Sequence, residues 1–345
     1  MGRFKSGIHG PKSALFTLVL PWVLAIGLLA AALHVIPLAD VWATLRGVSL
    51  PGLVALMVLN GLVLLALNGR WWFILRGQGQ AVAFMPLLGY RLAAFGVTYF
   101  TPGPQFGGEP VQVALVEREH GVPRATAVAA VALDKSLELL VNFLFLAVGV
   151  GVVLQQRLFG DMLGGETAVL AALLLAVPFL FLGATWRGWY PVTRGLQFVG
   201  RFRGWPWRTR WQGGFARLLA GLQESEAQAT HFCQSSPGAL AAALLVSLVG
   251  WLLMVAEYGL MLRVLGLELT AVQTIAMLTA ARVAFLLPLP GGLGTLEASQ
   301  VLTLTLLGFD PAAGLSASLL IRGRDVSLAS LGLWLAVSRP RLTAN

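Results

Sequence analysis

The sequence predicts an all-α integral membrane protein with about six transmembrane helices and two re-entrant hairpins of broken helix, arranged as an inverted-topology repeat. Of its 345 residues, 57% are hydrophobic and only 11% are charged, whereas a soluble domain carries about 25% charged residues because its surface faces water. Six segments are apolar enough to approach the roughly 20 residues that cross a bilayer as a helix. Two longer apolar stretches are interrupted by proline and glycine.

The whole chain, residues 1–345, is expected to form one polytopic membrane domain. Its six apolar segments are residues 14–36, 53–67, 125–154, 168–185, 239–262 and 312–337. The first is expected to stay as a transmembrane helix, because its apolar stretch is too long for a cleaved signal peptide. The single cysteine, Cys233, excludes an internal disulfide framework and a multi-cysteine metal site.

Basic residues orient these segments. The chain has 24 Lys and Arg against 15 Asp and Glu, a net charge of +9, and in a membrane protein excess basic residues mark the cytoplasmic loops. The bases that flank the apolar segments, Arg70 and Arg76 among them, are placed inside, which leaves Arg46, Arg157 and Arg263 outside. Both termini are then cytoplasmic and each broken stretch enters and leaves on one side. The expected location is the cytoplasmic (inner) membrane of a bacterium or archaeon.

The central loop, residues 186–237, is basic and polar. Apolar side chains recur in it at helical spacing, opposite a polar face; the apolar ones are Trp211, Phe215, Leu218, Leu219 and Leu222, and the polar ones Gln223, Glu224, Glu226 and Gln228. This pattern predicts an amphipathic helix on the inner leaflet. The alternative is a linker helix that packs on the transmembrane bundle. Nucleic-acid binding is not expected.

The two broken stretches, residues 84–120 and 271–308, resemble each other. Each has an arginine in an apolar half-helix, a Pro-x-Pro break with glycines, a glutamate and a second half-helix; the arginine and glutamate are Arg91 and Glu109, then Arg282 and Glu297. Proline removes a backbone donor, and non-helical backbone inside a membrane must be buried in protein or line a wet cavity. Two re-entrant hairpins are therefore predicted. The alternative is a pair of kinked helices without a ligand.

Each broken stretch lies between two apolar segments, so that residues 53–154 and 239–337 form two repeats of opposite orientation. The segment after each break carries charge: Asp134, Lys135 and Glu138 in the first repeat, Arg322, Arg324 and Asp325 in the second. Secondary transporters use such repeats and place their sites where the repeats meet.

Charged side chains inside apolar segments are expensive and are functional candidates by default. The predicted substrate-binding set is Arg91, Glu109, Asp134, Lys135, Arg282, Glu297, Arg322 and Arg324. Its five bases suggest an anionic head group, because guanidinium groups bind phosphate bidentately. The two glutamates are expected to hold arginines or to bind the cationic part of a zwitterion. Glu257 is expected to pack against one of the cations, and Arg324 and Asp325 are candidates for snorkelling.

Motifs for an enzyme are missing from the sequence. It contains no phosphate-binding loop, nucleophile elbow or zinc-protease motif, so no catalytic residue, metal or cofactor is expected. His120 is expected to be a satisfied interface residue. The leading hypothesis is a lipid translocase with a polar cavity at mid-membrane, whose partners are a membrane lipid as substrate and the bilayer; a homo-oligomer is left open. The alternatives are a membrane-embedded transferase or accessory subunit using a lipid-linked donor, and a small-solute secondary transporter.

The motifs around both breaks resemble those of the lysylphosphatidylglycerol synthase transmembrane-domain family, whose members are often called flippase-like proteins. The matching residues are Gly108-Glu109, Asp134-Lys135, the run from Pro288 to Glu297, and Arg322. In the multiple peptide resistance factors this domain moves aminoacylated phosphatidylglycerol, and a separate soluble domain makes that lipid. The resemblance therefore implies lipid handling.

Two features of the sequence depart from that family. It carries no soluble synthase domain, so it is expected not to make lysyl-lipid. Gln112 stands where many members have a basic residue, and Lys135 where arginine is more frequent. Relatives of this size are associated with glycolipid, hopanoid or polyprenyl-phosphate pathways, so the resemblance leaves the lipid open.

Overall fold

The computed structural model describes residues 38–101, 107–155, 165–200, 212–287, 289 and 292–338, and every regular element in these ranges is a helix. The first predicted span, residues 14–36, lies outside them, as do the four break prolines, Arg157 and Trp211. The helices are α2 (Leu38–Arg46), α3 (Leu50–Gly77), α4 (Phe84–Phe100), α5 (Glu109–His120), α6 (Arg124–Gln155), α7 (Gly165–Trp186), α8 (Pro191–Gly200), α9 (Gln212–Ser235), α10 (Pro237–Val264), α11 (Ala271–Leu286), α12 (Thr295–Leu306) and α13 (Pro311–Val337).

Three of these helices, α3, α6 and α10, are long and apolar enough to cross a membrane. They contain three of the predicted spans, and α7 and α13 coincide with two more. Large apolar side chains such as Met57, Val148 and Leu252 are exposed on them. A water-soluble bundle would turn such side chains inward, whereas lipid accepts them. The prediction of an all-helical membrane protein is confirmed at this level.

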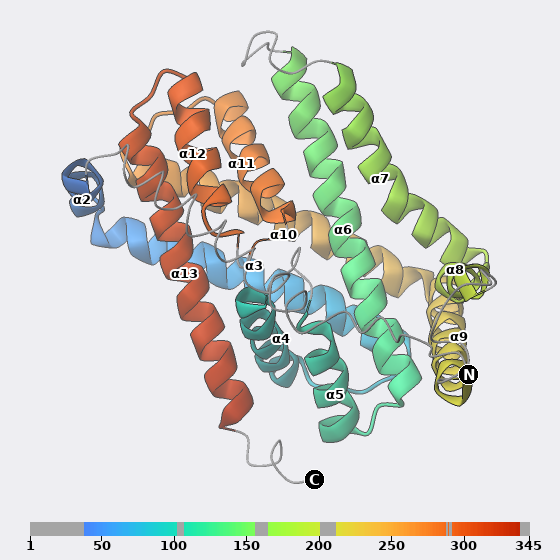
Figure 1. The fold of residues 1–345 in the computed structure, drawn as a ribbon. Helices are drawn as coiled ribbons and strands as arrows, with labels where there is room; N and C mark the ends of the chain where they lie inside the picture. Colours follow the sequence, from blue (N-terminus) through green and yellow to red (C-terminus); the bar gives the residue numbers. More distant parts are fainter. Residues whose placement is uncertain are drawn as a thin grey trace, which may run out of the picture.

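Each broken stretch contains two short helices, α4 and α5 in the first and α11 and α12 in the second. The described residues between them are not α-helical; they are 101, 107 and 108 in the first stretch and 287, 289 and 292–294 in the second. Gly292 and Gly294 have φ of +66° and +76°, a region that glycine enters without a steric penalty. The pair α4–α5 lies toward one end of the bundle and the pair α11–α12 toward the other (Figure 1).

The two halves of the chain interlock. Helix α4 packs along α13, α11 packs against α6, and α3 packs along α10. The α4–α13 contact is close because glycines line it: a Cβ atom at Gly96 would lie 2.6 Å from the carbonyl oxygen of Ala329, and one at Gly332 would overlap the carbonyl of Leu92. Small residues allow such close approach of helices in membranes.

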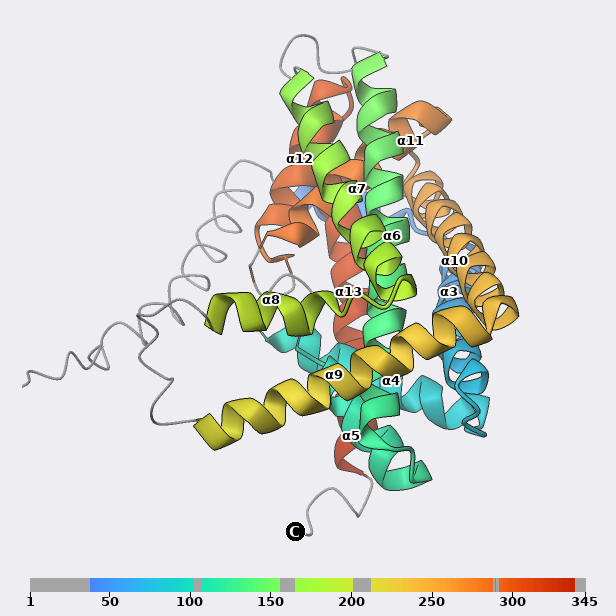
Figure 2. The ribbon, with the colours of Figure 1, turned by 90° about the vertical axis from the view of Figure 1, so that its right-hand side faces the viewer.

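Helices α8 and α9 run across the long helices α6 and α7 (Figure 2). The C-terminal half of α9 packs on the bundle through Ala229, Phe232 and Cys233, all buried in the core. For this half the linker-helix alternative describes the structure better than a helix lying only on the leaflet. The side chains of Phe215 and Leu218 lie outside the described residues; Leu219 and Leu222 are half-buried.

Glu226, predicted on the polar face of α9, is buried. Its carboxylate accepts hydrogen bonds from the backbone N–H groups of Val192 (2.7 Å) and Thr193 (3.0 Å) at the start of α8. Because the first N–H groups of a helix have no partner within it, a carboxylate there is stabilising. The prediction that Glu226 belongs to a polar face was wrong, because a hydrogen-bonding partner 33 positions away in the chain cannot be read from the helical periodicity.

Cys233 is expected to resist alkylation in the native protein. Burial raises the pKa of its thiol to about 11, so little reactive thiolate forms at neutral pH. Mass spectrometry after treatment with a water-soluble maleimide at pH 7.5 should find label only once dodecyl sulfate is added. The double variant Cys233→Ser, Ser235→Cys, which moves the thiol to an exposed position on the same helix, should label rapidly without denaturant. Equal native rates for the two proteins contradict the burial.

Candidate functional site

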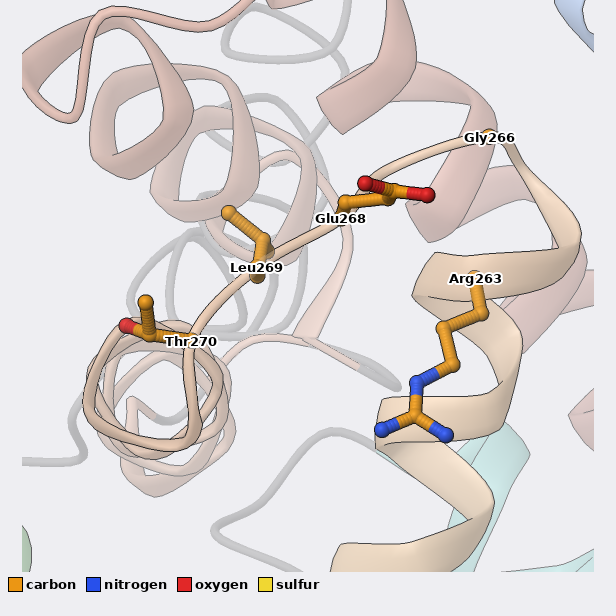
Figure 3. Close-up of a pocket in the computed structure, with 5 residues that line it drawn as sticks. All are labelled: Arg263, Gly266, Glu268, Leu269 and Thr270. Atoms are coloured by element: carbon orange, nitrogen blue, oxygen red, sulfur yellow. The ribbon is translucent and has the colours of Figure 1, made fainter.

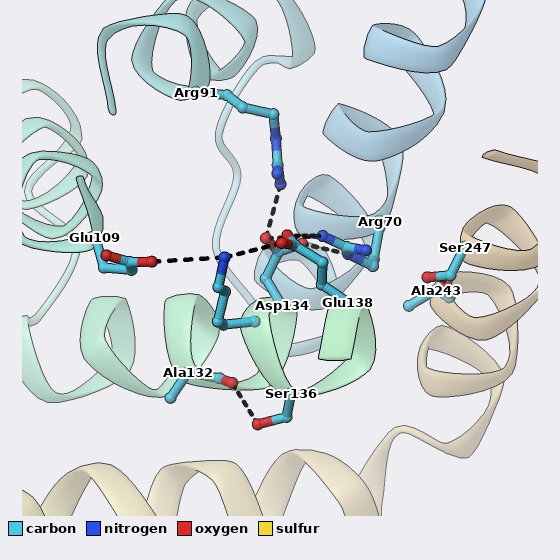
Figure 4. Close-up of polar contacts among 10 residues, drawn as sticks. Arg70, Arg91, Glu109, Ala132, Asp134, Ser136, Glu138, Ala243 and Ser247 are labelled. Atoms are coloured by element: carbon cyan, nitrogen blue, oxygen red, sulfur yellow. Dashed lines mark hydrogen bonds and ion pairs between the residues drawn. The ribbon is translucent and has the colours of Figure 1, made fainter. Parts of the chain in front are cut away.

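The first charged cluster is centred on Asp134 of α6. Its carboxylate accepts hydrogen bonds from Arg70 Nε at 2.6 Å and Arg91 Nη2 at 2.9 Å, so that α3, α4 and α6 meet on one side chain (Figure 4). Arg70 is fully buried and Asp134 is 4% exposed. A buried charge persists only when it is paired, and here one carboxylate compensates two guanidinium groups.

Glu138, Lys135 and Glu109 extend this cluster toward the first break. Lys135 Nζ lies 2.8 Å from Glu138 and 3.8 Å from Glu109, and Glu138 also pairs with Arg70 at 3.1 Å. Glu109 accepts a hydrogen bond from Gly107 N at 2.7 Å within the break itself. The first cluster, Arg70, Arg91, Glu109, Asp134, Lys135 and Glu138, therefore balances three bases with three carboxylates. Glu109 was expected to hold an arginine or to bind the cationic part of a zwitterion, and in the structure its ion-pair partner is Lys135.

Arg70 is the member that the sequence assignment missed. It was placed in the cytoplasm because the predicted span ended at residue 67, but α3 continues to Gly77. Arg70 shares one helical face with buried Val63 and Ile74. The apolar residues that follow it, Trp71 to Leu75, were the available signal that the helix goes on.

The second charged cluster is Glu257, Glu297, Arg322, Arg324 and Asp325, and its core is a fork between Arg322 and Glu297. Arg322 donates from Nε (2.9 Å) and Nη2 (3.2 Å) to the two oxygens of Glu297. Its Nη2 also donates to the Gly292 carbonyl in the second break at 2.7 Å, and its Nη1 lies 3.4 Å from Tyr99 Oη of α4. Glu297 thus holds an arginine as expected, and Tyr99 links the two halves of the chain.

Arg324 completes this cluster by pairing with Glu257 (2.8 Å) and Asp325 (2.9 Å). Glu257 also accepts a hydrogen bond from Asn60 of α3 at 3.1 Å. The expectation that Glu257 packs against a cation is confirmed. Of the two residues considered for snorkelling, Arg324 keeps 37% of its side chain exposed, whereas Asp325 is buried.

Arg282 of α11 differs from the other predicted bases. Across the described ranges no carboxylate lies within 4.0 Å of its guanidinium group; Nη2 instead contacts Met254 Sδ at 3.1 Å. The group lies 4.7 Å from the ring centre of Trp251, which stacks on Phe145. It interacts at longer range with Glu138 of the first cluster and with Arg324 and Asp325 of the second. Helix α11, which carries Arg282, packs against α6 of the first cluster and α12 of the second, so Arg282 lies on a helix between the clusters.

His120, the remaining candidate from the sequence, lies outside both clusters. His120 Nε2 lies 3.0 Å from Tyr90 Oη, as an interface residue would. An open hollow of about 480 Å³ at the α10–α11 connection is lined by Arg263, Gly266, Glu268, Leu269 and Thr270 (Figure 3), which belong to neither cluster. In the described ranges, no three or more His, Cys, Asp or Glu side chains gather as metal ligands would.

Comparison with known proteins agrees with this architecture. A membrane protein called UPF0104 from Methanothermobacter thermautotrophicus is 23% identical over 313 residues, which cover 87% of this chain and 88% of that protein. No solved structure matches the chain significantly. The family model of the lysylphosphatidylglycerol synthase TM region matches residues 18–332. The chain is a member of this family of integral membrane proteins.

Proposed function

We propose that this protein is a lipid translocase, which moves an anionic or zwitterionic lipid head group past the two charged clusters while the acyl chains stay in the bilayer. The observation that carries the proposal is the position of the clusters, since each contains a side chain that hydrogen-bonds to the backbone of one of the two helix breaks. Glu109 accepts from Gly107 N, and Arg322 donates to the Gly292 carbonyl. Broken helices that present polar groups inside a membrane are the usual construction of transporter sites.

The arrangement of the helices supports an inverted repeat. Helix α4 of the first half packs on α13 of the second, α11 of the second packs on α6 of the first, and α3 packs along α10. These contacts are the ones that a twofold relation between residues 53–154 and 239–337 produces. In this proposal α4–α5 and α11–α12 are re-entrant from opposite sides of the cytoplasmic membrane, with both termini inside.

The charge balance within the two clusters favours a lipid head group as the cargo over a dissolved cation and anion. Most of the predicted bases are already paired with carboxylates, so an incoming phosphate must exchange with one of those carboxylates or bind where no carboxylate is present. A zwitterionic head group offers both charges and disturbs the balance least. Rearrangement of the Tyr99–Arg322 contact between the halves then exposes the head group to the other side.

Reconstitution in liposomes tests the proposal. Vesicles with the purified protein and fluorescent phosphatidylglycerol should lose their inner-leaflet label to dithionite, after the label crosses to the outer leaflet, at least about tenfold faster than protein-free vesicles. Arg91→Gln should slow this exchange, because it removes one of the two guanidinium partners of Asp134 and disturbs the first cluster, while the pair of Asp134 with Arg70 remains. Arg76→Gln, at an exposed position at the end of α3, is the control and should leave the rate unchanged. A wild-type rate equal to that of protein-free vesicles refutes the proposal.

A further inference from the structure

Among the bases of the predicted site, Arg282 has the hydrogen-bonding capacity that a ligand needs. A guanidinium group has five N–H donors. Arg70, Arg91, Arg322 and Arg324 each donate at least one of these to a carboxylate. Arg282 instead contacts a thioether sulfur, a weak acceptor. Arg282 is half-buried rather than enclosed, so its donors are within reach of an incoming oxygen.

The surroundings of Arg282 hold the guanidinium group in place without neutralising it. It lies over Trp251 of α10, and Trp251 stacks on Phe145 of α6 with ring centres 4.7 Å apart. A cation on an aromatic face is held by the ring quadrupole and keeps its full charge. The aromatic stack therefore fixes the direction of the group and leaves its charge for an external anion.

Lipid chemistry fits this location better than a water-soluble anion. Val283, next to Arg282 on α11, is 47% exposed, and Leu287, which follows the end of α11, is 46% exposed. Leu252, next to Trp251 on α10, is 70% exposed. An unneutralised base beside exposed apolar side chains matches a molecule with a phosphate at one end and hydrocarbon at the other. Glu257 and Asp325, the two carboxylates that pair with Arg324, also interact with Arg282 at longer range.

We infer that Arg282, supported by Trp251, binds the phosphate of the lipid head group directly, and that the other bases of the two clusters act as structural ion-pair partners. This inference rests on the proposed function and adds to it the residue that recognises the cargo. Recognition of the phosphate then depends on one guanidinium group, which lies against Met254 and Trp251 rather than against a carboxylate.

Binding to detergent-purified protein, followed by native mass spectrometry, tests the inference. The probes are dioctanoyl phosphatidylglycerol, dioctanoylglycerol, which lacks the phosphate, and glycerol 3-phosphate, which lacks the chains. Arg282→Gln should weaken phosphatidylglycerol binding at least about tenfold, because a charge-assisted hydrogen bond to the phosphate is lost, and should leave dioctanoylglycerol binding unchanged. Arg263→Gln, an exposed arginine at the end of α10, is the matched control and should bind as the wild type does.

Two further variants keep the test decisive. Arg282→Met removes the charge and suits the apolar contacts of Met254 and Trp251, so it replaces Arg282→Gln if that protein does not fold. Arg282→Lys should recover part of the binding. The inference is overturned if the charge-removing variant binds phosphatidylglycerol like the wild type, if dioctanoylglycerol binding falls equally, or if glycerol 3-phosphate competes as well as the lipid.

This assay measures binding and not movement, so the two proposals fail separately. If binding depends on Arg282 but vesicles show no exchange, the proposed function is wrong and the binding residue stands. If vesicles exchange lipid and the charge-removing variant binds and exchanges at the wild-type level, the translocase stands and the role of Arg282 is wrong.

Discussion

Asp134→Asn is expected to lower the free energy of unfolding in mixed micelles by about 3–5 kcal/mol, the usual effect of removing one partner from a buried ion pair. Arg70 is fully buried, and Asp134 is its closest ion-pair partner at 2.6 Å. The amide also leaves Arg91 without the carboxylate that it contacts at 2.9 Å. Titration with dodecyl sulfate, followed by helical circular dichroism, measures the change.

The control for this prediction is Asp40→Asn on α2, where the aspartate is exposed, and the expected change is within about 0.5 kcal/mol. A second comparison separates lost pairing from lost packing. The double variant Arg70→Met, Asp134→Asn removes the stranded base, so it should be more stable than the sum of the two single effects predicts. Additive effects in this pair contradict a direct interaction.

Gly332→Ala is expected to destabilise the protein by about 3 kcal/mol or more, because overpacking of a closed contact forces backbone movement. The new methyl group overlaps the carbonyl group of Leu92 on α4. That neighbour is backbone, so no side-chain rotation relieves the clash, and α4 and α13 must separate. Thermal unfolding in detergent, followed by size-exclusion chromatography of the remaining folded protein, measures the loss.

Gly323→Ala on the same helix is the matched control. A Cβ atom there meets no other atom within 4 Å, and alanine is a better helix former than glycine by about 1 kcal/mol. This variant should be as stable as the wild type or slightly more stable. If Gly332→Ala behaves in the same way, the close packing of α4 on α13 is wrong.

The sequence predicted those features of the fold that depend on residues close together in the chain. Single glycines such as Gly96 and Gly332 are tolerated inside these helices, but a Pro-x-Pro pair followed by glycines is a strong local signal for a break. The breaks between α4 and α5 and between α11 and α12 were therefore predictable from residues 84–120 and 271–308 alone. The apolar segments follow from composition in the same way. Which helix packs on which did not follow, because the α4–α13 contact depends on glycines more than 200 positions apart, such as Gly96 and Gly332.

The sequence predicted which residues belong to the candidate site better than it predicted which of them pair with one another. A charge within an apolar segment must be buried with a partner, which selected seven members of the two clusters and Arg282. The partners are set by three-dimensional packing: Asp134 pairs with Arg70, 64 positions away, and Arg322 with Tyr99, 223 positions away. The prediction of five bases available to an anion was therefore too generous, since four of them are paired inside the protein.

Because the two halves interlock, some helices of the first half can complete their packing only after helices of the second half have been inserted. A chain that enters the membrane from its N-terminus inserts α4 long before α13 has been synthesised, yet α4 finds its close glycine contact and the Tyr99–Arg322 link only on α13. Asp134, the partner of Arg91, is synthesised soon after α4, but the rest of the α4 surface stays in contact with lipid until α13 is inserted. Packing of the first half is thus completed only by a helix that begins more than 200 residues later in the chain.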